Sequence, residues 1–91
     1  MDTRRAFAQS LKELRKNKGI TQEDFSDVSS RTYISMIERG LKCPTLEKID
    51  EFADVLHVHP LTLLSLTYLY ADGDQDLDKL FIRVRSELGQ A

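Results

Sequence analysis

The stretch that decides the fold runs from Gly19 to Leu46 and reads GITQEDFSDVSSRTYISMIERGLKCPTL. It contains two helix starts, at Thr21 and at the pair Ser29-Ser30, because hydroxyl oxygens accept hydrogen bonds from the free amides of a first turn. Gly40 ends the second helix, since glycine adopts a left-handed backbone conformation without steric cost. The stretch predicts two short helices in close succession, the second over about residues 31–39.

Regions on both sides of this stretch are also predicted to be helical. Upstream, Asp2 or Thr3 can cap a helix that ends at Gly19. Its buried stripe consists of Phe7, Leu11 and Leu14, at spacings of four and three residues. Downstream, Thr45 caps a helix whose predicted core residues are Leu46, Ile49, Ala53 and Leu56. With no alternating strand pattern, the predicted class is all-α.

The last two predicted helices carry more apolar surface than one core contact needs. His59 and Pro60 start a helix that runs to about Tyr70 and is apolar around most of its circumference. A final helix starts near Asp76. Its apolar stripe consists of Leu77, Leu80, Phe81, Val84 and Leu88. This stripe can pack on the preceding helix of its own chain or across a two-fold axis onto a second chain, and the sequence leaves both open.

Length and charge limit the classes of protein that fit. A chain of 91 residues fits one domain with a modest core, so self-association is expected. The net charge is -2, but residues 1–44 hold nine Lys/Arg against six Asp/Glu, whereas residues 45–91 hold four against nine. A basic half can contact phosphates while an acidic half faces away from them. Chance fluctuation in a short chain explains this asymmetry equally well.

Several other classes are not expected. Cys43 is the single cysteine, and Met1 leads directly into charged residues without an apolar signal segment, so a cytoplasmic protein is expected. The longest weakly polar stretch, Leu61 to Ala71, is shorter than the roughly 20 residues of a membrane span. His57 and His59 have no ligand cluster beside them. We expect no enzyme, no catalytic residue, no metal, no cofactor, and see no evident small-molecule pocket.

Three segments carry a resemblance to a known family: GITQEDF at 19–25, YISMIERG at 33–40 and CPTL at 43–46. They resemble the Xre/Cro/CI-type helix-turn-helix family. The resemblance covers about residues 4–66, with the motif at about 21–40. It implies a five-helix, phage-repressor-like DNA-binding domain, followed here by an additional helix at about 76–88 within a single domain, 1–91.

The resemblance implies that double-stranded DNA is a partner and that the helix at 31–39 enters the major groove. Gln22 would meet a phosphate at the start of the preceding helix, with Arg39 and Lys42 as phosphate clamps on the other side. Base readers would be the outward residues Ser30, Arg31, Thr32, Ser35 and Met36. Arg31 is the leading candidate, because a guanidinium can bond both O6 and N7 of guanine. Tyr33 either contacts a phosphate or covers the junction between the two helices.

Two further expectations concern the geometry of the motif. The resemblance implies a structural ion pair between Arg15 and Glu38, which would fix the groove-entering helix against the first helix. Family members usually have a longer connection, containing a glycine, between the helices. Here Phe25 and Ser35 are ten positions apart with no glycine between them, so the second helix or its turn must be shorter.

The combined hypothesis is a sequence-specific transcriptional regulator, a repressor that binds a palindromic operator as a homodimer. The predicted dimerisation residues are Leu66, Leu69, Leu77, Leu80, Phe81, Val84 and Leu88. The alternative is an antitoxin-like or other protein-interaction module that uses the acidic, leucine-rich carboxy-terminal half.

Overall fold

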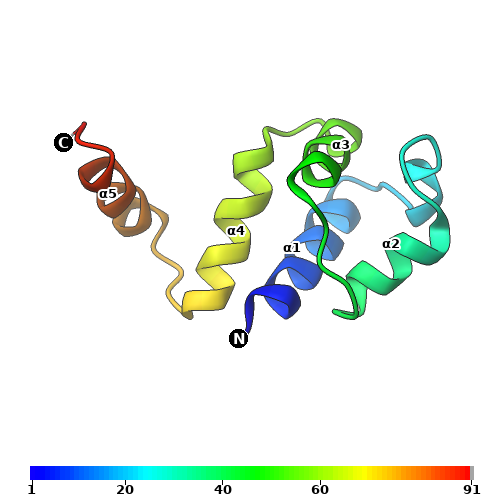
Figure 1. Ribbon diagram of the computed structural model, residues 1–91, viewed down its shortest axis with the longest axis horizontal. Coiled ribbons are helices and arrows are strands. Elements are labelled where there is room, and N and C mark those ends of the chain that lie inside the picture. Colours follow the sequence, from blue (N-terminus) through cyan, green and yellow to red (C-terminus); the bar gives the residue numbers. More distant parts are fainter. Residues whose placement is uncertain (91) are drawn as a thin grey trace.

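The computed structural model describes residues 1–90 and contains five α-helices and one 3-10 helix, with no strand in that range (Figure 1). In chain order these are α1 (Thr3–Asn17), η1 (Gln22–Phe25), α2 (Arg31–Glu38), α3 (Leu46–Leu56), α4 (Pro60–Asp72) and α5 (Leu77–Glu87). The all-α prediction is confirmed. The predicted domain range ends at residue 91, outside the described part of the chain. Among the described residues, no helix is long and apolar enough to cross a membrane.

Side-chain caps set where the helices begin. Each cap accepts a hydrogen bond from an amide of the first turn of its helix. The caps are Asp2, Thr21, Ser30, Thr45, His59 and Asp76. All six lie at starts predicted from the sequence, and the structure selects Asp2 and Ser30 where two neighbouring residues were possible. Prediction works here because a cap depends only on residues within one turn.

The second predicted helix is reduced to a single 3-10 turn, η1. Thr21 and Asp24 form a reciprocal capping box at its start. Its last residue, Phe25, is fully buried and meets the ring of Phe52 edge-on, with centroids 5.7 Å apart. The segment 26–30 then leads directly into α2. The short connection therefore removes helical length and keeps the inward aromatic residue in the core.

The core lies where α1 packs between α2 and α4, with α3 closing one end (Figure 1). Its buried members are Phe7, Leu11, Phe25, Ile34, Ile37, Ile49, Phe52, Leu56 and Leu63. The prediction for Leu46 was wrong, because its side chain is 74% exposed. Leu46 is the first residue of α3, one turn before the first buried residue Ile49, and helical side chains tilt toward the amino-terminal end of their helix, which is here the end away from the buried residues of α3. Phe52, absent from the predicted stripe, takes the central place.

Helix α5 stands apart from the rest of the molecule. It follows the segment 73–76 and lies at the opposite end of the long axis from α2 (Figure 1). Its main contact is with α4, and no residue of α5 is buried. The apolar stripe of α5 is thus only partly covered within one chain.

Candidate nucleic-acid interface

The outward face of α2 follows from the two residues that anchor its inner face. Ile34 and Ile37 are fully buried, which turns the opposite side of the helix toward solvent. The outward residues Arg31, Thr32, Ser35 and Arg39, together with Gln22 from η1, line one shallow cavity of about 320 Å³. Five of the nine predicted DNA-contacting residues therefore share one polar surface, which consists of hydrogen-bonding and cationic groups.

Gln22 sits at the rim of this surface but is held from within. Its amide nitrogen donates to Oε1 of Glu38 at 3.1 Å, and the side chain is half-buried. The predicted attraction of a phosphate to a helix amino terminus is weak here, because η1 has only four residues and its capping box already uses two amides. The phosphate contact predicted at Gln22 stays a prediction, resting on its side chain alone.

The other predicted contact residues have structural duties as well. The hydroxyl oxygen of Ser30 accepts from the Tyr33 amide at 3.1 Å and caps α2. The ring of Tyr33 lies 6.5 Å from that of Phe52, and the Lys42 ammonium is 5.9 Å from the Tyr33 centroid. These contacts favour the covering role among the two considered for Tyr33, and they hold Lys42 beside α2. Met36 is half-buried.

Arg15 and Glu38 meet in a bidentate ion pair. Arg15 Nε lies 2.7 Å from Glu38 Oε2 and Nη2 lies 2.9 Å from Oε1, while Nη1 donates to the Ile20 carbonyl at 3.0 Å. The side chains are only 11% and 4% exposed. The hydrogen bond with Glu38 raises the pKa of Arg15 above its ordinary value, against the opposing effect of burial. Glu38 is thus neutralised by α1 and does not present a bare charge to an approaching phosphate.

A group of cations from α1 extends the surface, and sequence reasoning missed it. Arg5 and Lys12 line a cavity of about 350 Å³ with Arg39, and Arg4 lines a neighbouring one of about 300 Å³. Gly40 ends α2 with φ at +73°, and a Cβ there would lie 3.6 Å from Arg5 Cγ. The sequence signal for these cations was the presence of Arg4 and Arg5 in the first turn of a helix. Positive charge is unfavourable there because it faces the positive end of the helix dipole, which suggests that these arginines serve a binding role.

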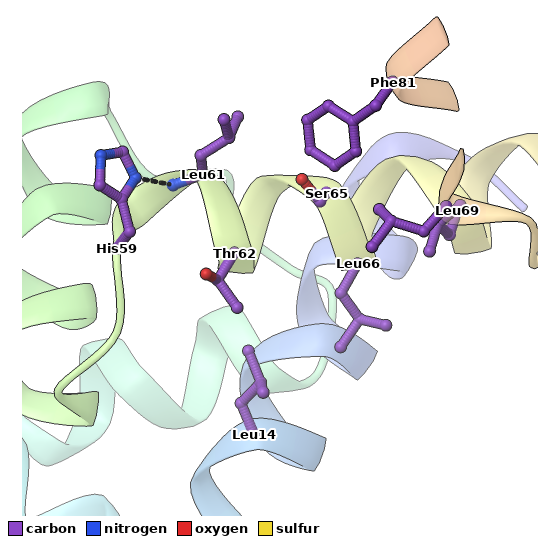
Figure 2. Close-up of a pocket in the computed structure, with 9 residues that line it drawn as sticks. Leu14, His59, Leu61, Thr62, Ser65, Leu66, Leu69 and Phe81 are labelled. Carbon is purple, nitrogen blue, oxygen red and sulfur yellow. Dashed lines mark hydrogen bonds between the residues drawn. The ribbon is translucent and has the colours of Figure 1, made fainter. Parts of the chain in front are cut away.

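Six of the seven residues predicted for dimerisation line two apolar cavities at the other end of the molecule. Leu66, Leu69, Leu77 and Phe81 line one of about 490 Å³, which Leu14 of α1 closes from below (Figure 2). Leu80 and Val84 join Phe81 along a second of about 430 Å³. Leu88 is 69% exposed and lines neither. No pocket was evident from the sequence, because these two arise only from how α5 stands off α4.

Comparisons with known proteins agree with this geometry. A family profile described as "Helix-turn-helix" matches residues 11–63, more than half of the chain. A protein of Sinorhizobium fredii, described as "Uncharacterized HTH-type transcriptional regulator y4dJ", is 36% identical over 69 residues, covering 74% of this chain and 90% of the relative. The matched residues contain all of η1, α2 and α3, and they include the five residues that line the polar surface of about 320 Å³.

Proposed function

This chain belongs to the Xre/Cro/CI-type helix-turn-helix family of DNA-binding transcriptional regulators, a non-enzymatic family, and we propose that it is a repressor that binds a palindromic operator as a homodimer. The observation that carries the proposal is the outward face of α2, where Arg31 and Thr32 are exposed and the half-buried Ser35 lines the same polar surface. Such a regulator acts in the cytoplasm, where it meets the chromosome.

In the proposed complex, α2 lies in the major groove with its amino-terminal half toward the bases. Arg31 bonds O6 and N7 of a guanine, while Thr32 and Ser35 contact neighbouring base edges. Arg39, Lys42 and the α1 cations meet the phosphates beside the groove. Five of the nine acidic residues of the carboxy-terminal half lie within residues 72–87, in the part of the chain that ends in α5, far from α2 (Figure 1). Their negative charge is therefore placed away from the duplex.

Selection from random duplex DNA tests the base-reading role. We expect the wild type to enrich one motif, and Arg31→Ala to lose preference at one guanine position, a discrimination of about 1–3 kcal/mol. Arg85→Ala, which removes an equal charge from α5, is the matched control and should retain the full motif. Enrichment of no motif by the wild type would contradict specific binding. An unchanged motif in Arg31→Ala would contradict the assignment of Arg31 alone.

A second copy of the chain is the proposed partner of the α4–α5 surface. Its apolar residues surround the two cavities, and α5 lies far enough from α2 that a second chain can cover it without blocking the DNA surface. A two-fold dimer also supplies the symmetry that a palindromic operator requires, with half-sites about one helical turn apart.

Sedimentation of the purified protein tests the homodimer. We expect a dimer for the wild type, a monomer for Phe81→Glu, and a dimer for Ile82→Glu, because Ile82 is 71% exposed and lines neither cavity. A wild type that stays monomeric, with this surface exposed, would favour the alternative of an interaction module that engages a different protein. Repression is tested separately, by expression of a reporter placed behind the selected operator.

A further inference from the structure

The segment before α2 is contacted by Lys48, a residue that does not belong to the polar surface of Gln22, Arg31, Thr32, Ser35 and Arg39. The glycine-free segment 26–30 carries the chain from η1 to α2, and the Val28 and Ser29 amides both bond back to the Phe25 carbonyl. The Val28 carbonyl, two residues before the Ser30 cap, accepts a hydrogen bond from the ammonium of Lys48 in α3. Lys48 thus connects α3 directly to the segment 26–30, which leads into α2.

The position of Lys48 in the first turn of α3 is unfavourable for a cation, which indicates that its contact with the Val28 carbonyl is important. It lies in the first turn of α3, where its amide bonds to the Thr45 cap at 3.2 Å, and where a cation is unfavourable because it faces the positive end of the helix dipole. Glu51, one turn further on, lies 3.5 Å from the ammonium. The lysine side chain is only 32% exposed. The unfavourable position of this cation in the first turn of α3 is therefore offset by its contacts with Glu51 and with the Val28 carbonyl.

The two ends of α2 are fixed by two separate charged contacts. Arg15 of α1 holds Glu38 at the carboxy-terminal end, and Lys48 of α3 holds the approach to Arg31 at the amino-terminal end. Between them only Ile34 and Ile37 are fully buried. We propose that Lys48 is a positioning residue for DNA recognition, which sets the direction of the first turn of α2 by donating its ammonium to the Val28 carbonyl. The inference rests on the proposed function for its DNA readout.

The test compares Lys48→Met, which keeps the length and apolar stem, with Lys48→Arg, which keeps a cationic donor. We expect Lys48→Met to bind the motif selected by the wild type about tenfold more weakly, the loss expected for one charge-assisted hydrogen bond. Binding to non-specific duplex and its salt dependence should be unchanged, and Lys48→Arg should recover most of the affinity. Lys79→Met, in exposed α5, controls for the lost charge and should match the wild type.

Amide hydrogen exchange gives a readout that does not need DNA. In Lys48→Met the Tyr33 amide, which bonds to the Ser30 cap, should exchange faster, while the Arg39 amide at the other end of α2 should not. Equal acceleration at both ends, or a lower thermal midpoint with unchanged affinity of the folded protein, would mean a merely structural role and overturn the proposal.

Two further outcomes separate this inference from the function on which it rests. If Lys48→Met weakens specific and non-specific binding together and lowers the salt slope by about one, Lys48 contacts a phosphate and the proposal is overturned. If the wild type selects no motif, the proposed function fails and the DNA role of Lys48 fails with it. A wild-type motif with unchanged binding by Lys48→Met contradicts Lys48 alone.

Discussion

The region formed by α1 to α4 has a buried apolar core, whereas the single helix α5 has none. The first region buries nine large apolar side chains in one cluster and holds the buried charges of Arg15 and Glu38 in a bidentate contact. Helix α5 has a cap, a polar face and an apolar stripe, but no buried residue. Its ion pair, Arg83 with Glu87, is 77% and 62% exposed.

The contrast teaches that equally regular helices can differ in what completes them. Apolar residues stabilise a fold in proportion to the surface they remove from water, and those of α5 remove little within one chain. The region α1–α4 has its own buried core and presents a polar face at α2, although α4 shares the apolar cavities with α5. We interpret α5 as an element that is completed by a second chain. Matched substitutions in the two regions test this difference.

The largest difference is expected between Phe52→Ala and Phe81→Ala. Phe52 is fully buried against Phe25, so its removal leaves a cavity and should lower the free energy of unfolding by about 3–5 kcal/mol. Phe81→Ala should cost less than about 1 kcal/mol in the monomer. Urea unfolding, followed by circular dichroism at a concentration below dimerisation, measures both. Similar costs would show that α5 is part of the same core.

A smaller difference is expected between two ion pairs. Glu38→Ala leaves Arg15 without its partner in a site where the Arg15 side chain is 11% exposed, and should cost about 3 kcal/mol. Glu87→Ala removes the corresponding partner from an exposed pair in α5 and should cost no more than about 0.5 kcal/mol. The same unfolding experiment compares them, and equal costs would contradict a bracing role for Glu38.

The smallest effect concerns pH at a contact within the α1–α4 region, near the end of α4 that leads to α5. The Tyr70 hydroxyl donates to Glu13 and links the end of α4 to α1, and this bond raises the pKa of Tyr70 above its ordinary value of 10.0. A raised pKa means that the contact stabilises the fold below pH 10 and that this contribution is lost as the pH rises through the folded-state pKa. Tyr70→Phe should therefore cost less than about 1 kcal/mol at pH 7. A cost that persists unchanged after the pH has risen through the folded-state pKa of Tyr70 would contradict this contact.

Sequence reasoning succeeded where structure depends on near neighbours. The caps at Thr21, Thr45 and His59 each act within one turn, so their residue types were sufficient, whereas the cap of α2 was narrowed only to Ser29 or Ser30. The contact of Arg15 with Glu38 spans 23 positions and could be expected only through the family resemblance. The exposure of Leu46 depends on where the core ends, which local spacing does not encode.

Parts of the candidate site could not be predicted for the same reason. Arg5 joins the cationic surface because α1 passes beside Gly40, and Lys48 reaches the Val28 carbonyl because α3 folds back on the short turn. Both placements are set by helix packing between segments distant in the chain. The outward residues of α2 could be predicted, since helical periodicity with Ile34 and Ile37 inward fixes which side faces out.

The number of protein chains bound to one selected duplex tests the combined claim that α2 reads DNA while α5 joins two copies. Native mass spectrometry of the complex gives this number directly. We expect two wild-type chains on one duplex whose two half-sites lie about one helical turn apart, and one chain, bound more weakly, for Phe81→Glu. A single wild-type chain bound at full affinity, or two chains retained by Phe81→Glu, would contradict the division of roles between α2 and α5.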